Sequence, residues 1–178
     1  MDKNATKSIL QSAGVPVVPW VSFTAAEFAV DRELWERRMQ GLGLPVFVKP
    51  ANLGSSVGIT KAHNVSELDK AIDVALRYDD VVVIEEGVTA REIEVAVLGN
   101  ATPETSLPGE ILPGSEFYDY EDKYITGAAQ LVIPAPLSDE AVREVRELAA
   151  KTFLAMRCAG MARVDFFYEE GGRGLLLN

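Results

Sequence analysis

Hydrophobic positions along this chain follow two periods, one typical of strands and one typical of helices. From Arg91 to Leu98 apolar and polar residues alternate, which predicts a strand with one buried face. Val81–Ile84 is an unbroken apolar run and predicts a buried strand. Residues 17–23 read as a strand that should lie at a sheet edge, because Pro19 cannot donate a ladder hydrogen bond. Further strands are predicted at 46–48, from Val57 onward, at 131–134, at 162–168 and from 175 to 178.

Helical spacing appears in four segments. Residues 6–13 and 24–40 predict two helices, each followed by glycine. A third helix should begin near Ser66, a plausible N-cap with an acidic residue three positions later. The fourth should begin at Ser138 and end before Gly160. Its expected core face consists of Val142, Val145, Ala149, Phe153 and Met156.

These elements form two groups, so we expect two α+β units, residues 1–88 and 89–178. The stretch from Gly109 to Gln130 is rich in glycine, acids and tyrosine, and no periodic pattern runs through it. We interpret it as an irregular, mobile loop or lid that holds three of the five tyrosines.

A glycine-containing loop lies between the strands predicted at 46–48 and from Val57. Backbone N–H groups around Gly54, Ser55, Ser56 and Gly58 can approach an anion closely, because no bulky side chain is in the way. Lys49 ends the preceding strand and can reach the same anion, for which phosphate is the natural candidate. An ordinary hairpin loop is an equally good interpretation of the pattern by itself. The spacing is neither the Walker pattern nor G-x-G-x-x-G.

Two further groups of residues could carry chemistry. Glu85-Glu86-Gly87-Val88 follows a buried strand at the junction of the two units, where ligand sites are frequent. Arg163 and Asp165 lie two residues apart on one strand face, about 6.5–7 Å from each other. A carboxylate beside a guanidinium suits a site for Mg²⁺ and a developing oxyanion, although such pairs are also common on exposed faces.

Composition narrows the class of protein. The 178 residues are 48% hydrophobic and 25% charged, as in soluble globular proteins. A net charge of −10 argues against nucleic acid or an anionic membrane as the main partner. The single cysteine, Cys158, excludes an internal disulfide, and the single histidine makes histidine-based metal sites unexpected. Without an apolar run of about 20 residues or a signal sequence, we expect a cytoplasmic protein.

The motif Val48-Lys49-Pro50 followed by Gly54-Ser55-Ser56-Val57-Gly58 closely resembles the nucleotide-binding segment of D-alanine–D-alanine ligases, members of the ATP-grasp superfamily. The resemblance covers almost the whole chain and implies an α+β, ATP-grasp fold, in which two subdomains with antiparallel sheets clasp ATP. Its implied cofactors are ATP and Mg²⁺ (or Mn²⁺), and its implied substrate is D-alanine, destined for peptidoglycan precursors.

The resemblance also implies a role for each matching residue. Those expected to contact the nucleotide are Lys3, Lys49, Ser56, Glu85, Glu86, Val88, Glu92 and Lys123. Within this set the lysines offset phosphate charge, Glu85 recognises the exocyclic amine of adenine and Glu92 binds the ribose. Ser55 and Tyr124 are expected to orient substrate, and that tyrosine is the pattern of ligases that make D-alanyl-D-alanine. Arg163 is expected to stabilise the tetrahedral intermediate and Asp165 to bind magnesium.

The sequence departs from the family pattern at its end. Asn178 resembles the first residue of an Asn-Glu-x-Asn motif whose glutamate and asparagine complete the metal site. We therefore expect this chain to be an inactive part of a longer, dimeric enzyme. Two alternatives stay open: another ATP-grasp carboxylate–amine ligase, or a non-catalytic nucleotide-binding fragment.

Overall fold

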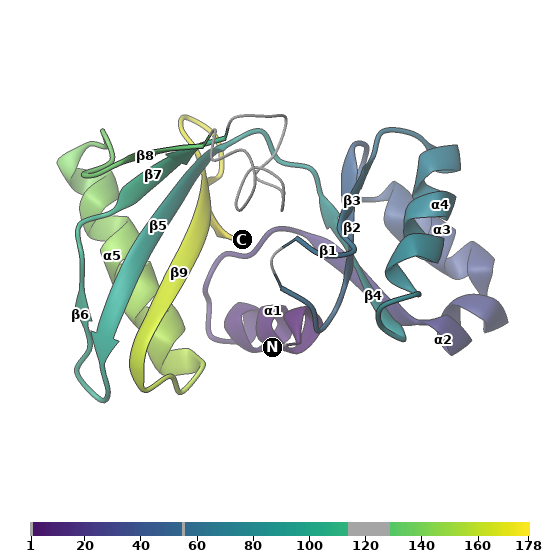
Figure 1. Cartoon of the computed structure of the whole chain (residues 1–178), viewed down its shortest axis with the longest axis horizontal. Coiled ribbons are helices and arrows are strands. Elements are labelled where there is room, and N and C mark those ends of the chain that lie inside the picture. The colour runs from purple at the N-terminus through teal and green to yellow at the C-terminus, as the bar shows by residue number, and fades with distance from the viewer. Residues whose placement is uncertain (1, 55, 114–128) are drawn as a thin grey trace. The chain divides into compact units, whose positions relative to one another are not determined.

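The computed structural model describes residues 2–54, 56–113 and 129–178 (Figure 1). Helices and antiparallel sheets make up the chain, so the predicted α+β class is confirmed. The chain divides into two compact units, with Met1–Thr6 and Val18–Val88 in unit 1 and Lys7–Val17 and Thr89–Asn178 in unit 2. The functional subdomains expected at 1–88 and 89–178 stay a prediction. The expected boundary after Val88 coincides with the end of unit 1. The two divisions differ at residues 7–17, which the structure groups with unit 2.

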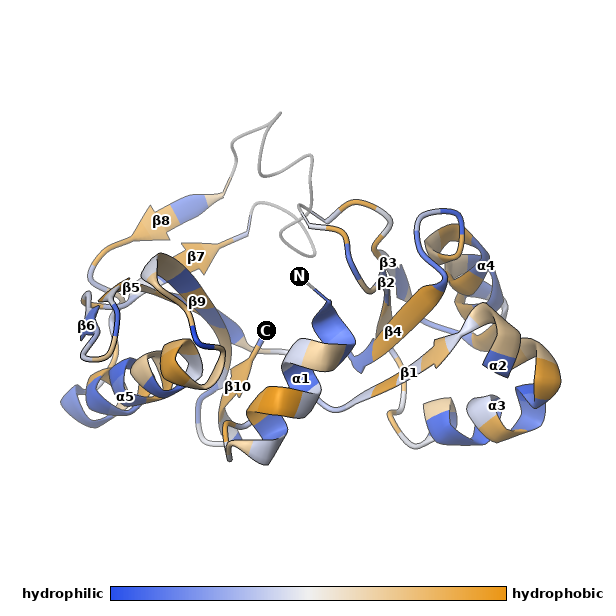
Figure 2. Ribbon diagram, turned by 90° about the horizontal axis from the view of Figure 1, so that it is seen from below, coloured by the Kyte–Doolittle hydropathy of each residue, from blue (hydrophilic) through white to orange (hydrophobic). Residues whose placement is uncertain are grey.

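Unit 1 contains a four-stranded antiparallel sheet. Its strands, in spatial order, are β1 (Trp20–Thr24), β4 (Val81–Glu86), β2 (Val46–Pro50) and β3 (Thr60–Ala62). β1 lies at an edge, as expected from Pro19. The central strand β4 is hydrophobic over most of its length and ends in two glutamates (Figure 2).

Three helices complete unit 1: α2 (Ala25–Val30), α3 (Arg32–Gln40) and α4 (Val65–Ala75). The sequence places five apolar residues in α4 and at its C-cap at helical spacing: Leu68, Ala71, Ile72, Ala75 and Leu76. This predicted stripe is confirmed, since the first four are buried and Leu76 packs against the core. The core of the unit combines these side chains with Phe23, Trp35, Met39, Val46, Val48, Ala62, Val82 and Ile84.

Two helix boundaries predicted for unit 1 were wrong. Residues 24–40 form two helices, because Asp31 ends α2 and its side chain accepts the Leu34 N–H to cap α3. The N-cap of α4 is Asn64 instead of Ser66. The side chain of Asn64 accepts the Glu67 N–H in the first turn, and the carboxylate of Glu67 accepts the His63 N–H just before the helix.

The strand predicted from Val57 begins three residues later, at Thr60. Ser56 and Gly58 both have positive φ, 59° and 73°. Two turn hydrogen bonds accompany them, from Val57 N–H to the Gly54 carbonyl and from Ile59 N–H to the Ser56 carbonyl. Left-handed backbone cannot continue a strand, so the loop extends further than the hydrophobic pattern indicated.

Unit 2 contains a six-stranded antiparallel sheet with one face covered by the long helix α5 (Asp139–Ala155). Its strands, in spatial order, are β10 (Gly174–Leu177), β9 (Gly160–Glu169), β5 (Arg91–Gly99), β7 (Gly109–Leu112) and β8 (Gln130–Val132), with β6 (Glu104–Thr105) also paired to β5. β7 corrects the prediction that the stretch from Gly109 is irregular. The proposed lid itself, residues 114–128, lies outside the described residues.

The core of unit 2 lies between the sheet and its helices. Ser138 caps α5 by accepting the Ala141 N–H, which confirms the predicted N-cap. The helix α1 (Lys3–Ser12) begins three residues earlier than predicted, where Asp2 accepts the Ala5 N–H. Buried side chains of this core include Leu10, Val15, Ile93, Val95, Val97, Val145, Ala149, Phe153, Val164, Phe166, Leu175 and Leu177. None of the helices within the described residues has the length and hydrophobicity that crossing a membrane requires.

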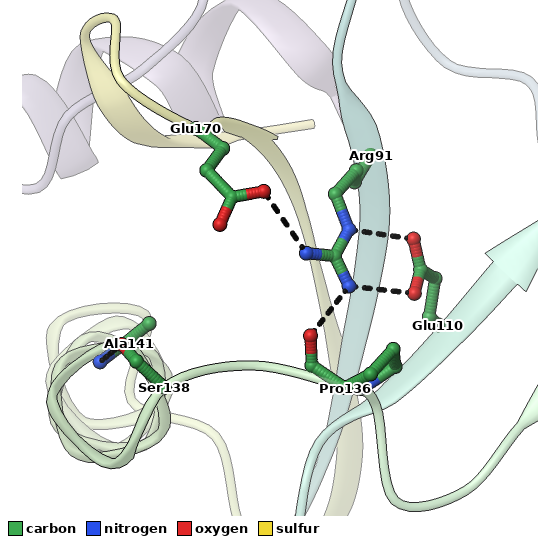
Figure 3. A network of polar contacts seen from close by, with 6 residues as sticks. All are labelled: Arg91, Glu110, Pro136, Ser138, Ala141 and Glu170. Atoms are coloured by element: carbon green, nitrogen blue, oxygen red, sulfur yellow. Dashed lines mark hydrogen bonds and ion pairs between the residues drawn. The ribbon is translucent and has the colours of Figure 1, made fainter.

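A buried ion pair fixes the start of β5 (Figure 3). The guanidinium of Arg91 donates two hydrogen bonds of 2.7 Å to the carboxylate of Glu110 on β7. It also donates to the carbonyl of Pro136, at 3.0 Å, and contacts Glu170 at 3.4 Å. Arg91 and Glu110 thus tie together β5, β7 and the segment that leads into α5, on the helix-covered side of the sheet. Glu92 follows Arg91 directly and faces the opposite side.

Candidate functional site

The sheet of unit 1 has a polar group on the side away from its helices. Phe47 pairs with Glu85 in register across β2 and β4, so Lys49, two residues further along β2, shares their face. The ammonium of Lys49 lies 2.5 Å from a carboxylate oxygen of Glu85. Their side chains are only 11% and 3% exposed. A buried cation and anion in contact form a fixed donor–acceptor pair that can read a polar ring edge.

Lys3 lies next to this pair, where it organises the backbone before the glycine loop. Its ammonium donates to the carbonyls of Pro50 at 2.8 Å, Ala51 at 3.4 Å and Leu53. Burial lowers the pKa of Lys3, and the charge of Lys49 lowers it further against the opposing effect of Glu85. The expected contact of Lys3 with the nucleotide stays a prediction, and in this structure the lysine binds the backbone that leads into the loop.

The glycine loop is held from its other side by Asp79. One carboxylate oxygen of Asp79 accepts the backbone and side-chain N–H groups of Asn52, both at 2.8 Å. Burial alone would raise the pKa of Asp79, but hydrogen bonds from Val81, Asn52 and Asp80 lower it overall. The polar residues of the loop are therefore presented on a backbone that side chains hold at two points.

Glu86 and Val88 lie at the end of β4 and just after it, as the sequence predicted. The Glu86 N–H donates to the carbonyl of Pro19 at 3.0 Å, so this donor is already used within unit 1. Between them, Gly87 passes so close to Pro45 that a Cβ would lie 2.5 Å from its carbonyl oxygen. This contact requires glycine and fixes the path of the chain past the buried Glu85.

The second polar group lies on the face of the unit 2 sheet opposite to α5. Arg163 binds Asp165 through two hydrogen bonds, Nε to Oδ1 at 2.7 Å and Nη2 to Oδ2 at 2.8 Å. The alternation of β9 is confirmed, since Val164 and Phe166 are buried in the core on the other side. Glu94 lies directly across from Asp165 on β5, with Oε2 3.2 Å from Nε of Arg163.

Glu94 was not singled out by the sequence analysis, which placed it on the polar face of its strand and assigned it no role. Burial raises the pKa of the Glu94 carboxyl, an effect that the cation of Arg163 partly offsets and the anion of Asp165 reinforces. Glu92 lies two residues away on the same face and is half-buried. The signal that could have identified Glu94 is its pairing with Asp165, which needs the strand register.

Carboxylate oxygens are the ligands that Mg²⁺ prefers, so Asp165 fits the predicted metal role in its chemistry. Within the described ranges, no three histidine, cysteine, aspartate or glutamate side chains come close enough to hold a metal ion.

The structure brings together Lys3, Lys49 and Glu85 in unit 1, and Arg163, Asp165 and Glu94 in unit 2. Ser56 lies in the glycine loop with positive φ. The remaining predicted site residues, Ser55, Lys123 and Tyr124, lie outside the described residues.

Comparison with known proteins gives a consistent result. A sequence model for the family described as "D-ala D-ala ligase C-terminus" matches residues 9–178. The chain is 52% identical over 179 aligned residues to a D-alanine--D-alanine ligase of Chlorobaculum parvum, covering 100% of this chain and 49% of that protein. It is 51% identical to a D-alanine--D-alanine ligase of a Thermoanaerobacter species, covering 100% of this chain and 50% of that protein.

Solved structures agree with the sequence relatives. The VanG D-Ala:D-Ser ligase from Enterococcus faecalis superimposes with a TM-score of 0.86 at 34% identity, over 100% of this chain and 51% of that one. The D-alanine-D-alanine ligase from Coxiella burnetii superimposes with a TM-score of 0.79 at 35% identity, over 100% of this chain and 46% of that one. The chain therefore spans about half the length of the relatives that it matches.

Proposed function

Because the chain belongs to the D-alanine–D-alanine ligase family, whose members depend on ATP and typically use Mg²⁺, we propose that the protein containing it joins two D-alanines. The fold expected from the sequence, ATP-grasp of the α+β class, is confirmed by the structural neighbours. In the proposed reaction ATP phosphorylates the carboxylate of one D-alanine. The amine of the second D-alanine then attacks the acyl phosphate and displaces phosphate, which leaves D-alanyl-D-alanine for peptidoglycan.

The observation that carries this proposal is the match along the whole chain to a D-alanine--D-alanine ligase at 52% identity. The geometry supports it, because residues that the family resemblance selected form a buried ion pair, Lys49 with Glu85, and a more exposed one, Arg163 with Asp165. The contact between Lys49 and Glu85 agrees with the proposal, because charges inside a sheet face are costly unless they are paired and the pair leaves a donor and an acceptor there.

In unit 1 we assign adenine recognition to Glu85, Glu86 and Val88. The buried carboxylate of Glu85 is an acceptor for an exocyclic amine, and Lys49 beside it is a donor for the neighbouring ring nitrogen or a phosphate oxygen. Lys3 would contribute positive charge to the same region, while its hydrogen bonds hold the backbone on which Ser56 is placed.

In unit 2 we assign ribose binding to Glu92, metal binding to Asp165 and oxyanion stabilisation to Arg163. The metal, when bound, neutralises phosphate charge and polarises the transferring phosphoryl group. The guanidinium of Arg163 has a planar array of donors that suits the two oxygens of a tetrahedral intermediate. Its bidentate pairing with Asp165 supports this assignment, since the same fork of donors already holds two carboxylate oxygens.

For the residues beyond the described ranges, the assignments rest on the resemblance alone. Ser55 and Tyr124 would orient the substrates and Lys123 would contact phosphate. D-Alanine is the proposed second substrate because of Tyr124, although one structural neighbour is a D-Ala:D-Ser ligase. A homodimer and a cytoplasmic location, expected from the family and from the composition, complete the proposal.

Enzyme assays on the full-length protein test the proposal. With ATP and Mg²⁺, ADP release should require D-alanine, and mass spectrometry should find D-alanyl-D-alanine. Offering D-alanine together with an excess of D-serine separates the two ligase types, and we expect the dipeptide of D-alanine to predominate. The assignment would be overturned if ADP were released at the same rate without D-alanine, or if the product contained mainly D-serine.

A further inference from the structure

The Nε atom of Arg163 lies near two carboxylates, those of Asp165 and Glu94. The Nε atom of arginine carries a single hydrogen, so it can make one good hydrogen bond. Nε lies 2.7 Å from Oδ1 of Asp165, which receives that hydrogen bond, and 3.2 Å from Oε2 of Glu94. Glu94 is therefore an ion-pair partner that stands within hydrogen-bond distance of a donor already in use.

The Oε2 atom of Glu94 is also shielded from solvent. Oε2 is buried and accepts no hydrogen bond from any of the described residues, while the Glu94 side chain as a whole is 16% exposed. An enclosed anionic oxygen without a hydrogen bond is costly, so an arrangement that supplies one is favoured. The Nε–H of Arg163, whose nitrogen lies 3.2 Å away, is a donor that could supply it.

The strands hold these three side chains in fixed register. Glu94 on β5 pairs directly with Asp165 on β9, and Ala96 pairs with Arg163. All lie on the face of the sheet opposite to α5, so the Nε–H of Arg163 can change its acceptor from Asp165 to Glu94 without any movement of the strands. Only a change of side-chain hydrogen bonding is needed.

We propose that Glu94 is a positioning residue: it accepts the hydrogen bond from Nε of Arg163 when Asp165 coordinates a divalent cation. This inference rests on the proposed function, because it needs Asp165 as the metal ligand. Hydrogen bonds from a bidentate arginine compete with a metal for the lone pairs of a carboxylate and weaken it as a ligand. When the Nε–H donates to Glu94 in place of Asp165, Oδ1 of Asp165 is released, the proton stays on Nε, and the guanidinium keeps its orientation.

The consequence is a coupling between Glu94 and metal binding that acts through Arg163. Without Glu94, Arg163 keeps both hydrogen bonds to Asp165, and the cation has to compete with them for the carboxylate oxygens. Glutamine at this position keeps an oxygen that can accept the Nε–H but loses the charge, so its effect should be intermediate.

Binding of Mn²⁺ to the full-length protein with a non-hydrolysable ATP analogue, followed by the EPR signal of free Mn²⁺, tests this proposal. We expect Glu94→Ala to weaken Mn²⁺ binding about five- to tenfold and Glu94→Gln about two- to threefold, the range of couplings between contacting residues. The matched control is Glu104→Gln, which removes an exposed carboxylate paired with Leu98 on the same sheet and should leave the affinity unchanged.

The decisive comparison repeats Glu94→Ala in an Arg163→Met background. If Glu94 acts through Arg163, its loss there should change Mn²⁺ affinity less than about twofold. An equal loss in both backgrounds would mean that Glu94 binds the metal directly, and an affinity unchanged by Glu94→Ala would also overturn the proposal. Asp165→Asn separates the two levels of the argument: if it leaves Mn²⁺ binding intact, the proposed metal site itself is wrong. Circular dichroism confirms that each variant is folded.

Discussion

Replacing Arg91 by alanine should destabilise unit 2 far more than the loss of an ordinary surface ion pair. Its partner Glu110 has a side chain only 7% exposed, and the two hydrogen bonds between them are 2.7 Å long. Removal of Arg91 leaves this carboxylate buried with its principal cation gone. Breaking a buried pair in this way costs about 3–5 kcal/mol, and the partial exposure of Arg91 places the expected loss near 3 kcal/mol.

Two companion variants make this prediction specific. Arg173 binds Glu169 with similar geometry, 2.7 and 2.8 Å, but its side chain is 41% exposed. Arg173→Ala should therefore cost at most about 1 kcal/mol. The double variant Arg91→Met/Glu110→Leu removes both charges together and should be within about 1 kcal/mol of the wild type, because apolar packing replaces a buried ion pair at little cost.

Urea denaturation monitored by far-UV circular dichroism gives the free energy of unfolding of each variant. The reasoning would be refuted if Arg91→Ala lost no more stability than Arg173→Ala. It would also be refuted if the double variant were as unstable as Arg91→Ala, because the cost would then come from lost packing instead of an unpaired Glu110.

Three further predictions follow from the fold. Gly58→Ala should cost about 1–2 kcal/mol of stability for the left-handed backbone alone, and more because its Cβ would lie 2.8 Å from the ring of Tyr78. Thermal unfolding measures the loss of stability, and ATP titration measures any effect of the distorted loop on nucleotide binding. Asp79→Ala should cost about 1–2 kcal/mol at neutral pH through lost hydrogen bonds, including those from Asn52. Since folding lowers the pKa of Asp79 below 3.8, this contribution is present above that pH and disappears as pH falls through the folded value, so urea curves of the two proteins should converge in acid. Ser138→Ala should cost about 1 kcal/mol by removing the cap of α5, measurable in the same urea experiment.

Much of the fold could be predicted because the hydrophobic pattern is locally consistent. The alternation in β5 and the apolar stripe of α4 are both observed. Errors occurred where a polar side chain decided the backbone path. Asp31 splits one predicted helix, and Asn64 captures the N-cap that was assigned to Ser66. β7 was missed because its strand is only four residues long and includes the buried charge of Glu110.

The candidate site was predictable where one strand carries the residues and not where two strands combine. Arg163 and Asp165 share a face of one strand, so their spacing gave the pair directly. The pairing of Lys49 with Glu85 joins β2 to β4, and that of Glu94 with Asp165 joins β5 to β9. Such contacts depend on strand order and register, which a single sequence leaves undetermined.

The central claim, that unit 1 carries an adenine-recognising nucleotide site built on Glu85, is tested most directly by calorimetric titration of the full-length protein with ATP and with GTP. Adenine offers an amine where guanine offers a carbonyl, so the acceptor Glu85 should make ATP bind at least about tenfold more tightly. Glu85→Gln, whose amide can also donate, should narrow that difference if the variant remains folded. Equal affinities for ATP and GTP in the wild type, or a preference untouched by Glu85→Gln, would contradict the account.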